Sequence, residues 1–287
     1  MSTHQNWFRS NIVDRLSDPS TDLKLELNPY SFEIMEFHDA ANYTTKLISQ
    51  AHDSIYVALS GGADSEYTLR TFHRNNIKVT PIIVVTEGNY DELQYAYQVC
   101  RDLNIEPVIL NIPDDHYLTW YHRIVRDISG YGIYCIPSII ACQYAKDNNG
   151  ILIIGEHLID TDKLSNKITP GANEWDFYNE CFVGEEWTIP FFNYTVELTY
   201  AMIKRIEDVP LNVFKSALYG TVLRPIMDYQ FSDRFLSVRN VINRTRKYKP
   251  NPHVDLGSKE EFLNVLQTGS DIYQNQRSGL VTSYSKR

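Results

Sequence analysis

Four short apolar runs alternate with helical stripes between residues 55 and 155. The runs are IYVAL at 55–59, KVTPIIVVTE at 78–87, EPVILNI at 106–112 and ILIIG at 151–155. Successive apolar positions over such lengths are typical of strands buried on both faces. Helical spacing of apolar residues between the runs predicts helices over about 64–74, 91–104, 115–129 and 137–147. This alternation predicts an α/β fold, with a doubly wound parallel sheet covered by helices on both faces.

The pattern weakens on either side of residues 39–165. Residues 1–38 form an extension in which one short helix is expected at about Trp7–Leu16. Beyond Leu164 the strand signal fades, and helices are predicted over 195–206 and 232–247, before a closing polar tail. We therefore divide the chain into an N-terminal extension, an α/β domain and a mainly helical, substrate-binding region with the tail, at 1–38, 39–165 and 166–287.

Polar segments follow each of the four predicted strands. In chain order they read SGGADS, TEGNYDE, NIPDDH and GEHLIDTD. Ligands of open parallel sheets bind at the carboxyl ends of the strands. These four segments are therefore where a binding site is expected.

Composition and charge narrow the range of functions. The formal charge of −9 argues against a protein that coats nucleic acid through its overall field, although a local basic strip is compatible with a structured RNA. The sequence has neither a signal-peptide-like start nor a run of about 18 apolar residues, so a cytoplasmic protein without a membrane segment is expected. The cysteines show no CxxC spacing, which disfavours a zinc ribbon or a redox pair, and Cys100 is expected in the core.

The segment SGGADS carries the strongest chemical signal. A strand that ends in two glycines and enters a helix directs backbone N–H groups and the positive end of the helix dipole at one point, which suits a phosphate. Ser60 and Ser65 add hydroxyl donors. Neither G-x-x-x-x-G-K-[ST] nor G-x-G-x-x-G is present. Asp64 would repel a bare phosphate, so its presence favours a divalent cation that bridges it to a nucleotide. A glycine-rich turn with a serine or aspartate helix cap is the structural alternative.

SGGADS resembles the SGGxDS signature of the PP-loop ATP pyrophosphatase superfamily, which includes the asparagine, GMP and NAD synthetase types. The segment DELQYAYQVCRDLNIEPVILNI at 91–112 is similar to the helix and strand that follow in that superfamily. GEHLID at 155–160 partially resembles its acidic, GEGADE-like loop. The similarity covers about residues 50–162 and implies an adenine nucleotide alpha hydrolase-like (HUP) fold.

The resemblance implies cleavage of ATP between the α- and β-phosphates. A carboxylate or carbonyl oxygen of a second substrate would be adenylated, and a nitrogen or sulfur nucleophile would then displace AMP. The implied cofactors are ATP and Mg²⁺. ATP contacts are implied for Ala58, Leu59, Ser60, Gly61, Gly62, Asp64, Ser65, Val85, Thr86 and Gly155, and Mg²⁺ ligation for Asp64 with Glu156 or Asp160.

Positive groups are expected to converge on the departing pyrophosphate, because preorganised charge is usually the largest catalytic contribution. Lys204 and Arg205 are taken, with Asp64 and Ser65, as the catalytic set. Further basic candidates are Lys163, Lys167, Arg224 and a strip of Arg234, Arg239, Arg244, Arg246, Lys247 and Lys249. The strip is read first as a solvated helix face, with a phosphate lid and an RNA contact as alternatives.

Three functions stay open from the sequence. The first is an asparagine-synthetase-like ligase without its glutaminase domain, since no cysteine precedes Cys100. The second is a tRNA or nucleobase modification enzyme of the 7-deazaguanine or thiolation type, for which Tyr219, Tyr229 and Tyr248 would stack on bases. The third is a non-catalytic module that binds adenine nucleotides.

The cysteines bear on the choice between nitrogen and sulfur chemistry. Superfamily members that transfer sulfur generally use paired cysteines, and the missing pairs favour nitrogen. Isolated thiols of Cys135, Cys142 or Cys181 are the remaining sulfur candidates. The expected partners are ATP, a small-molecule or RNA acceptor and a separate ammonia- or sulfur-donor protein, with a homodimer left open.

Overall fold

The computed structural model describes a central sheet, the helices that cover it and several short outer elements. The described residues are 7–10, 25–27, 32–86, 89–113, 119, 136–155, 159–162, 167–170, 188–205, 211–221, 258–268, 271–275 and 279–283. No helix among these residues combines the length and the apolar character that a membrane span requires.

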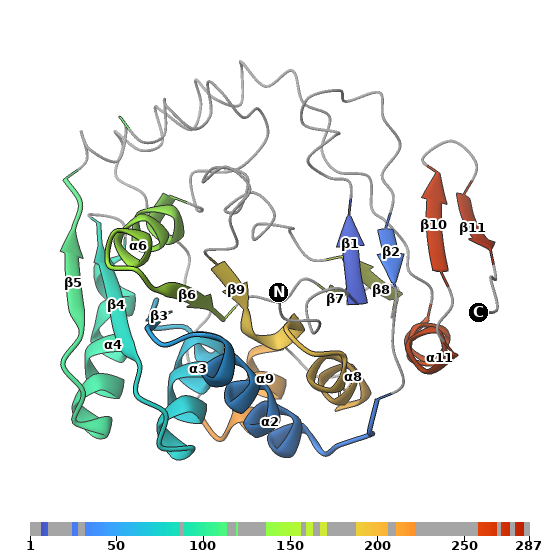
Figure 1. The fold of residues 1–287 in the computed structure, drawn as a ribbon, viewed down its shortest axis with the longest axis horizontal. Helices are drawn as coiled ribbons and strands as arrows, with labels where there is room; N and C mark the ends of the chain where they lie inside the picture. The colour runs from blue at the N-terminus through green and yellow to red at the C-terminus, as the bar shows by residue number, and fades with distance from the viewer. Residues whose placement is uncertain are drawn as a thin grey trace.

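Five parallel strands form the central sheet (Figure 1). In spatial order they are β5 (Val108–Asn111), β4 (Thr80–Val85), β3 (Ile55–Ala58), β6 (Ile151–Ile154) and β9 (Thr188–Pro190). Tyr56 of β3 lies opposite Thr80 on one side and Leu152 on the other. The chain moves one way from β3 to β5 and the other way from β6 to β9, so the strand order reverses between β3 and β6. Open α/β sheets bind ligands in the crevice at such a reversal.

Helices cover both faces of the sheet. One face carries α2 (Phe37–Ala51), α3 (Ala63–Arg74), α4 (Tyr90–Leu103) and α8 (Val196–Arg205), and the other carries α6 (Ile136–Asp147). Alternate strand residues serve the two sides: Ile151 and Ile153 join the larger core, whereas Leu152 and Ile154 face α6. Both sets are apolar, which explains the unbroken apolar runs. The predicted α/β class with a parallel sheet covered on both faces is confirmed.

The predicted elements of this region match the observed ones, with ends that differ by a few residues. Strands β3, β4, β5 and β6 fall inside the four apolar runs, and α3, α4 and α6 correspond to predicted helices. Cys100 is buried on α4, as expected for a core cysteine. Apart from Thr119, the helix predicted over 115–129 lies outside the described residues, as does the one over 232–247.

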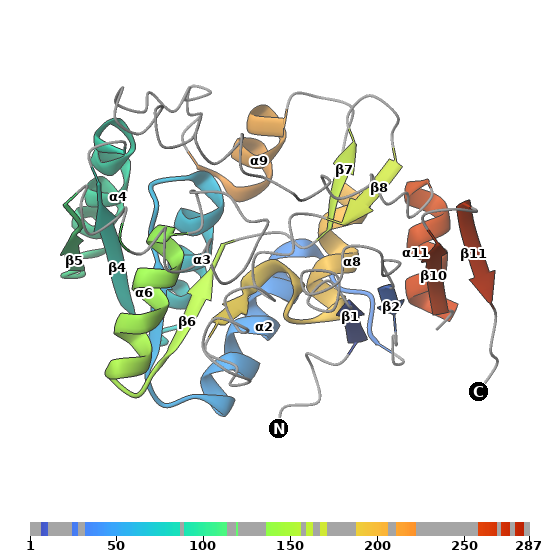
Figure 2. The same ribbon diagram turned by 90° about the horizontal axis from the view of Figure 1, so that it is seen from above.

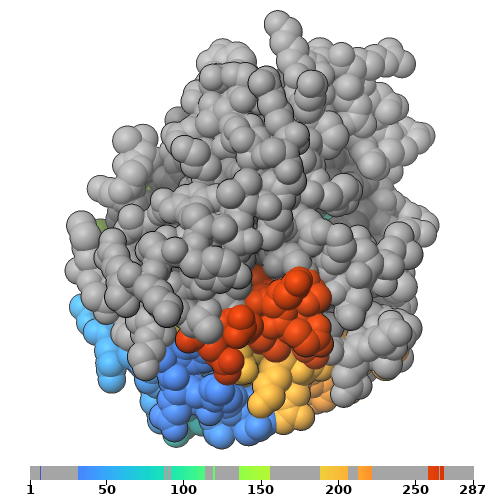
Figure 3. Space-filling view, turned by 90° about the vertical axis from the view of Figure 1, so that its right-hand side faces the viewer, coloured from blue at the N-terminus to red at the C-terminus, as the bar shows by residue number. Residues whose placement is uncertain are grey.

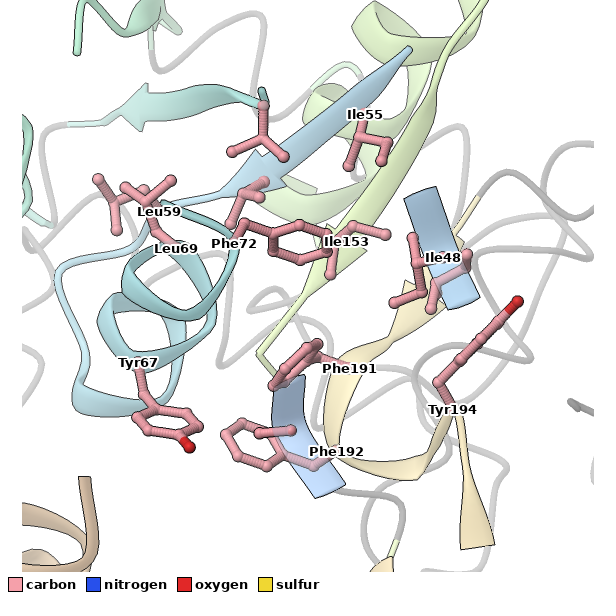
Figure 4. Close-up of a cluster of buried hydrophobic side chains, with 14 of the residues drawn as sticks. Ile48, Ile55, Leu59, Tyr67, Leu69, Phe72, Ile153, Phe191, Phe192 and Tyr194 are labelled. Carbon is pink, nitrogen blue, oxygen red and sulfur yellow. The ribbon is translucent and has the colours of Figure 1, made fainter. Parts of the chain in front are cut away.

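The larger core lies between the sheet and the helices α2, α3, α4 and α8. Figure 4 shows Phe72 of α3, Ile153 of β6 and Phe191 gathered in this space. Phe72 and Phe191 are completely buried, and their ring centroids are 5.9 Å apart. Phe191 begins η3 (Phe191–Asn193), a single turn that links β9 to α8. This turn therefore ties the last strand of the sheet to the core.

The sheet takes its fifth strand from beyond residue 165. No strand is predicted past Leu164, yet β9 pairs with β6 and all three of its residues are buried. Three residues are too few to show the alternation that identifies a strand. The sheet therefore continues beyond the point where the strand signal fades, while the proposed division of the chain stays a prediction.

The two ends of the chain contain strands that the sequence does not predict, and the helix expectation is wrong for residues 8–10. In place of the start of the helix expected at about Trp7–Leu16, the structure has β1 (Phe8–Ser10), antiparallel to β2 (Leu25–Leu27). The expected polar tail contains a hairpin of β10 (Asp271–Asn275) and β11 (Gly279–Ser283). Short helices are marginal without tertiary contacts, and strand formation depends on partners distant in sequence, so local patterns decide neither segment.

The remaining elements pack around this frame. They are a two-stranded antiparallel pair, β7 (Ile159–Asp162) and β8 (Lys167–Pro170), and the helices α9 (Leu211–Tyr219) and α11 (Lys259–Thr268). Helices α2, α8 and α11 lie side by side on one face of the molecule (Figure 3). Helix α9 lies against α3 (Figure 2). The N-terminal segment is held by Trp7, whose buried indole N–H donates to the carbonyl oxygen of Asn193 at 3.0 Å.

Replacing Phe191 by alanine tests the importance of the β9–η3 link for stability. Because the ring is fully buried between sheet and helices, Phe191→Ala should lower the free energy of unfolding by about 3–5 kcal/mol. Ile109→Ala is the control, since Ile109 of β5 is 44% exposed and its loss should cost less than about 1 kcal/mol. Urea unfolding followed by circular dichroism measures both, and equal losses would show that the link is not part of the core.

Candidate functional site

The loop between β3 and α3 lies where the strand order reverses. The pairing of β3 with β4 continues one residue past the strand, because the N–H of Leu59 donates to the carbonyl oxygen of Ile82 at 2.9 Å. Gly61 then takes a φ of 97°, in the left-handed region that favours glycine. Gly62 is the extended N-cap residue, and α3 begins at Ala63. SGGADS thus forms the strand–turn–helix arrangement that its sequence predicts.

Backbone packing around the loop leaves no room for a side chain at two glycines. A Cβ at Gly61 would lie 2.4 Å from the carbonyl oxygen of Glu92 in α4. A Cβ at Gly155, which follows β6, would lie 2.7 Å from the backbone nitrogen of Ser65 and 2.8 Å from the carbonyl carbon of Asp64. The first turn of α3 is therefore held closely between the end of β6 and the start of α4.

The two serines of the loop hold its shape. The hydroxyl of Ser65 donates to the carbonyl oxygen of Gly62 at 3.0 Å, and the Oγ atoms of Ser60 and Ser65 are 3.2 Å apart. Since Ser65 gives its only hydroxyl proton to Gly62, Ser60 is the donor in the serine pair. The oxygen of Ser60 in turn accepts from the N–H of Gly62 at 3.2 Å. The predicted ligand-binding serines thus preorganise the loop.

The turn after β4 is closed by the side chain of Asn89, the N-cap residue of α4. Its Oδ1 accepts from the N–H of Thr86 at 2.9 Å, and its Nδ2 donates to the carbonyl oxygen of Val84 at 2.8 Å. Val85 and Thr86, which the resemblance places against adenine, are both buried here. Because β3 and β4 are parallel neighbours, this turn lies at the same edge of the sheet as SGGADS.

Asp64, in the first turn of α3, is held by two side chains from α9. The Nζ of Lys215 lies 2.6 Å from one carboxylate oxygen, and the hydroxyl of Tyr219 donates to the other at 2.8 Å. Lys215 and Tyr219 are four residues apart and so project from the same side of the helix. The side chains of Asp64 and Lys215 are 24% and 16% exposed, so the ion pair is more sheltered than a surface pair.

An aromatic layer lies behind this ion pair. The rings of Tyr67 and Tyr219 stack with centroids 4.7 Å apart, and Phe37 and Phe192 stack against both. The hydroxyl of Tyr67 pairs with Nδ1 of His38 at 2.9 Å. Burial raises the pKa of Tyr67, whereas burial and then the nearby Arg74 lower the pKa of His38. The layer is therefore uncharged near neutral pH, and it fixes α9 against α3.

The burial of Tyr219 corrects one expectation from the sequence. Tyr219 is predicted as an exposed ring for stacking on an RNA base, but it is buried in the aromatic layer and its hydroxyl is bonded to Asp64. A buried ring cannot stack on a base. Tyr229 and Tyr248, the other predicted stacking residues, lie outside the described residues.

Lys204 and Arg205 lie at the exposed end of α8. Arg205 pairs with Glu36, and both line a cavity of about 420 Å³ together with Phe37, His38, Val213, Phe214, Ala217 and Leu218. The structure shows neither basic residue in contact with the SGGADS loop, and their catalytic role stays a prediction. Lys167 lies in β8, and the other basic candidates, Lys163, Arg224 and the strip at 234–249, lie outside the described residues.

The structure describes the side-chain contacts of one predicted magnesium ligand, Asp64. Asp64 lies at the start of α3, Asp160 belongs to β7, and Glu156 lies outside the described residues. Within the described part of the chain, no three histidine, cysteine or acidic side chains cluster as a metal site. The oxygens of Asp64 are nevertheless the hard donors that Mg²⁺ prefers.

The described cysteines are unsuited to nucleophilic chemistry. Burial raises the pKa of both Cys100 and Cys142 to about 11, so neither is a thiolate at neutral pH. The Sγ of Cys142 is also 3.1 Å from the hydroxyl of Thr188. Cys135 and Cys181 lie outside the described residues.

Lys215 and Asn89 are the residues of this site that sequence reasoning missed. Lys215 belongs to no motif, and its pairing with Asp64 spans 151 positions. Its one local signal is the spacing to Tyr219, which places both on one helix face. Asn89 lies in the TEGNYDE segment, just before a predicted helix. Asparagine is a preferred N-cap residue at such a position, which is the signal that could have identified it.

Comparisons with solved structures find distant likenesses. An NH3-dependent NAD synthetase from Campylobacter jejuni matches at a TM-score of 0.36 and 14% identity, over 82% of this chain and 93% of that one. An NMN synthetase from Francisella tularensis matches at 0.36 and 16%, over 77% and 99%. A predicted subunit of a tRNA methyltransferase from Methanocaldococcus jannaschii matches at 0.37 and 12%, over 81% and 98%.

No protein-family model matches the sequence, and a search of curated proteins finds no relative. Support for a function comes from the residues of the SGGADS loop.

Adding a methyl group at Gly155 tests whether its contact with α3 shapes a nucleotide site. Gly155→Ala must push the first turn of α3 away from β6, and we expect ATP binding to weaken by about tenfold or more. Isothermal titration calorimetry measures the binding.

The matched control is Gly150→Ala, whose Cβ would overlap the ring of Tyr56 and the carbonyl oxygen of Ser54, away from the loop. This variant should lose stability and keep ATP affinity. Equal affinity in both variants would show that the contact at Gly155 is not needed for binding.

Proposed function

We propose that this protein is an ATP pyrophosphatase of the PP-loop type. It binds the β- and γ-phosphates of ATP in the Ser60–Ser65 loop, and it transfers AMP to a carboxylate or carbonyl oxygen of a second substrate. The observation that carries the proposal is the shape of SGGADS at the strand reversal. The loop combines a glycine in the left-handed region, two serines that are hydrogen-bonded to each other, and a helix N-terminus. It contains no lysine of the G-x-x-x-x-G-K-[ST] kind.

The reaction follows from where the loop would hold the phosphates. The acceptor oxygen attacks the α-phosphorus and forms a new P–O bond, while the bond from the α-phosphorus to the β-bridging oxygen breaks. Pyrophosphate leaves with the electrons of that bond. Backbone N–H groups at the start of α3 and the positive end of its dipole stabilise the growing negative charge. A nitrogen nucleophile then attacks the carbon that carries the adenylated oxygen, the carbon–oxygen bond to AMP breaks, and the nitrogen loses a proton to solvent.

Asp64 fits the magnesium role that the resemblance implies. Mg²⁺ in proteins is usually held by one or two carboxylates together with phosphates of the substrate, and Asp64 stands beside the phosphate loop. When bound, Mg²⁺ would neutralise part of the charge on the departing pyrophosphate. This chain would contribute the carboxylate of Asp64, held on the first turn of α3.

Nitrogen chemistry is favoured over sulfur chemistry by the state of the described thiols. Cys100 and Cys142 are buried and protonated at neutral pH, so neither is ready to carry a persulfide. The burial of Tyr219 removes one of the aromatic contacts expected for an RNA acceptor. We therefore place a small carboxylate or amide acceptor ahead of tRNA.

Incubation with ATP labelled at the α- or γ-phosphate and Mg²⁺ tests the proposal directly. We expect AMP and pyrophosphate in the presence of a suitable acceptor, with amino acids and bulk tRNA as alternative supplements. Formation of ADP would contradict the proposed bond cleavage. Turnover that requires tRNA would favour the modification enzyme, and binding of ATP without turnover under all conditions would favour a non-catalytic module.

Asp64→Asn tests the role of the loop carboxylate. The amide oxygen of asparagine can still accept from Lys215, and its amide nitrogen can donate to the hydroxyl oxygen of Tyr219, so the fold should persist. The weakened cation site should nevertheless reduce pyrophosphate release by about a hundredfold or more. Thermal unfolding verifies the fold. Asp147→Asn, at the exposed end of α6, is the control and should keep full activity. Unchanged turnover in Asp64→Asn would contradict the assignment.

A further inference from the structure

Lys215 lies beside the SGGADS loop, although it comes from a separate helix, α9. Its Nζ is 2.6 Å from Asp64, whose backbone lies in the same first turn of α3 that forms the loop. Nothing in the loop itself supplies a positive side chain, because SGGADS has no lysine or arginine. The ammonium group of Lys215 is thus already beside the place where the proposed function requires a phosphate.

The charge of Asp64 makes this placement meaningful. An unpaired carboxylate would repel a phosphate entering the loop, and the ion pair with Lys215 removes that repulsion. With Mg²⁺ on the carboxylate, the ammonium and the metal would be two cations on the same group and would repel each other. A phosphate held in the loop would then be the new anionic partner of the ammonium.

The ammonium group of Lys215 can change partners while helix α9 stays in place. Phe214 and Tyr219 are buried on either side of Lys215 in the sequence, and Tyr219 is stacked in the aromatic layer. The end of the helix is closed by the hydroxyl of Ser216, which donates to the carbonyl oxygen of Thr221. The lysine side chain has a flexible four-carbon stem, so its head can shift while these anchors stay in place.

We propose that Lys215 is a phosphate-binding residue of this site, and that it occupies the Mg²⁺ position on Asp64 until metal and nucleotide bind. The proposal rests on the proposed function and adds the cation that the loop lacks. In the free protein Lys215 neutralises Asp64, and in the loaded site it contacts the β- or γ-phosphate. A single residue therefore opposes metal binding and favours nucleotide binding.

Opposite changes in two affinities distinguish this role from a structural one. Lys215→Met removes the competitor for Asp64, so Mn²⁺, used as a probe for Mg²⁺ and followed by electron paramagnetic resonance, should bind about threefold to tenfold more tightly. The same variant should bind ATP with Mg²⁺, and inorganic pyrophosphate with Mg²⁺, about tenfold to a hundredfold more weakly by calorimetry. Binding of AMP, which lacks these phosphates, should not change.

Two further variants complete the test. Lys215→Arg keeps the positive charge and should keep ATP affinity within a few fold of the wild type, even if Lys215→Met proves too unstable to titrate. Lys46→Met, which removes an exposed lysine of α2, should leave every affinity unchanged. Weaker binding of both Mn²⁺ and ATP in Lys215→Met, at an intact fold, would show a structural role and overturn the proposal.

The outcomes also separate this inference from the proposed function. If wild-type protein binds neither ATP nor pyrophosphate, the proposed function fails and the role of Lys215 fails with it. If wild-type protein binds ATP and Lys215→Met binds it equally well, only the role of Lys215 is overturned.

Discussion

The structure depends on the close approach of three backbones at the first turn of α3. Gly61 lies against Glu92 and Gly155 lies against Ser65, at distances that exclude any Cβ. Such contacts fix the loop by main-chain packing, so its position does not depend on flexible side chains. The strand reversal between β3 and β6 is what brings these ends together, because parallel strands direct all their carboxyl ends to one edge. The geometry of the SGGADS loop is thus a property of the sheet.

The aromatic layer extends this control to parts of the chain that are distant in sequence. Phe37 comes from the start of α2, Phe192 from the turn after β9 and Tyr219 from the end of α9, and all stack around Tyr67 of α3. Two of the four rings carry hydroxyls, one bonded to His38 and the other to Asp64. Burying the rings together therefore fixes the position of α9 against α3. A site that begins as a local motif is completed by segments more than a hundred residues away.

Much of this arrangement could be predicted from the sequence, for physical reasons that differ between elements. Strands β4 and β6 are buried on both faces, so they are unbroken apolar runs, and the turn after β3 needs glycine for its φ. The strand β9 is too short to show a pattern, and β1 and β10 form through pairing that no local signal records. The pairing of Lys215 with Asp64 could not be predicted, because the spacing of Lys215 and Tyr219 places both on one helix face but does not identify a partner 151 positions away.

A carboxylate inside a phosphate loop is at first sight unfavourable, and in a chain with a formal charge of −9 it adds to a field that repels nucleotides. The local field is what matters at contact distance, since charges beyond about 10 Å are largely screened. Around Asp64 that field is made by the positive end of α3 and by Lys215, at 2.6 Å. In the proposed function, the carboxylate is the exchangeable partner of a cation. It would keep the ammonium at the loop when no phosphate is bound, and it would offer oxygen ligands to a metal.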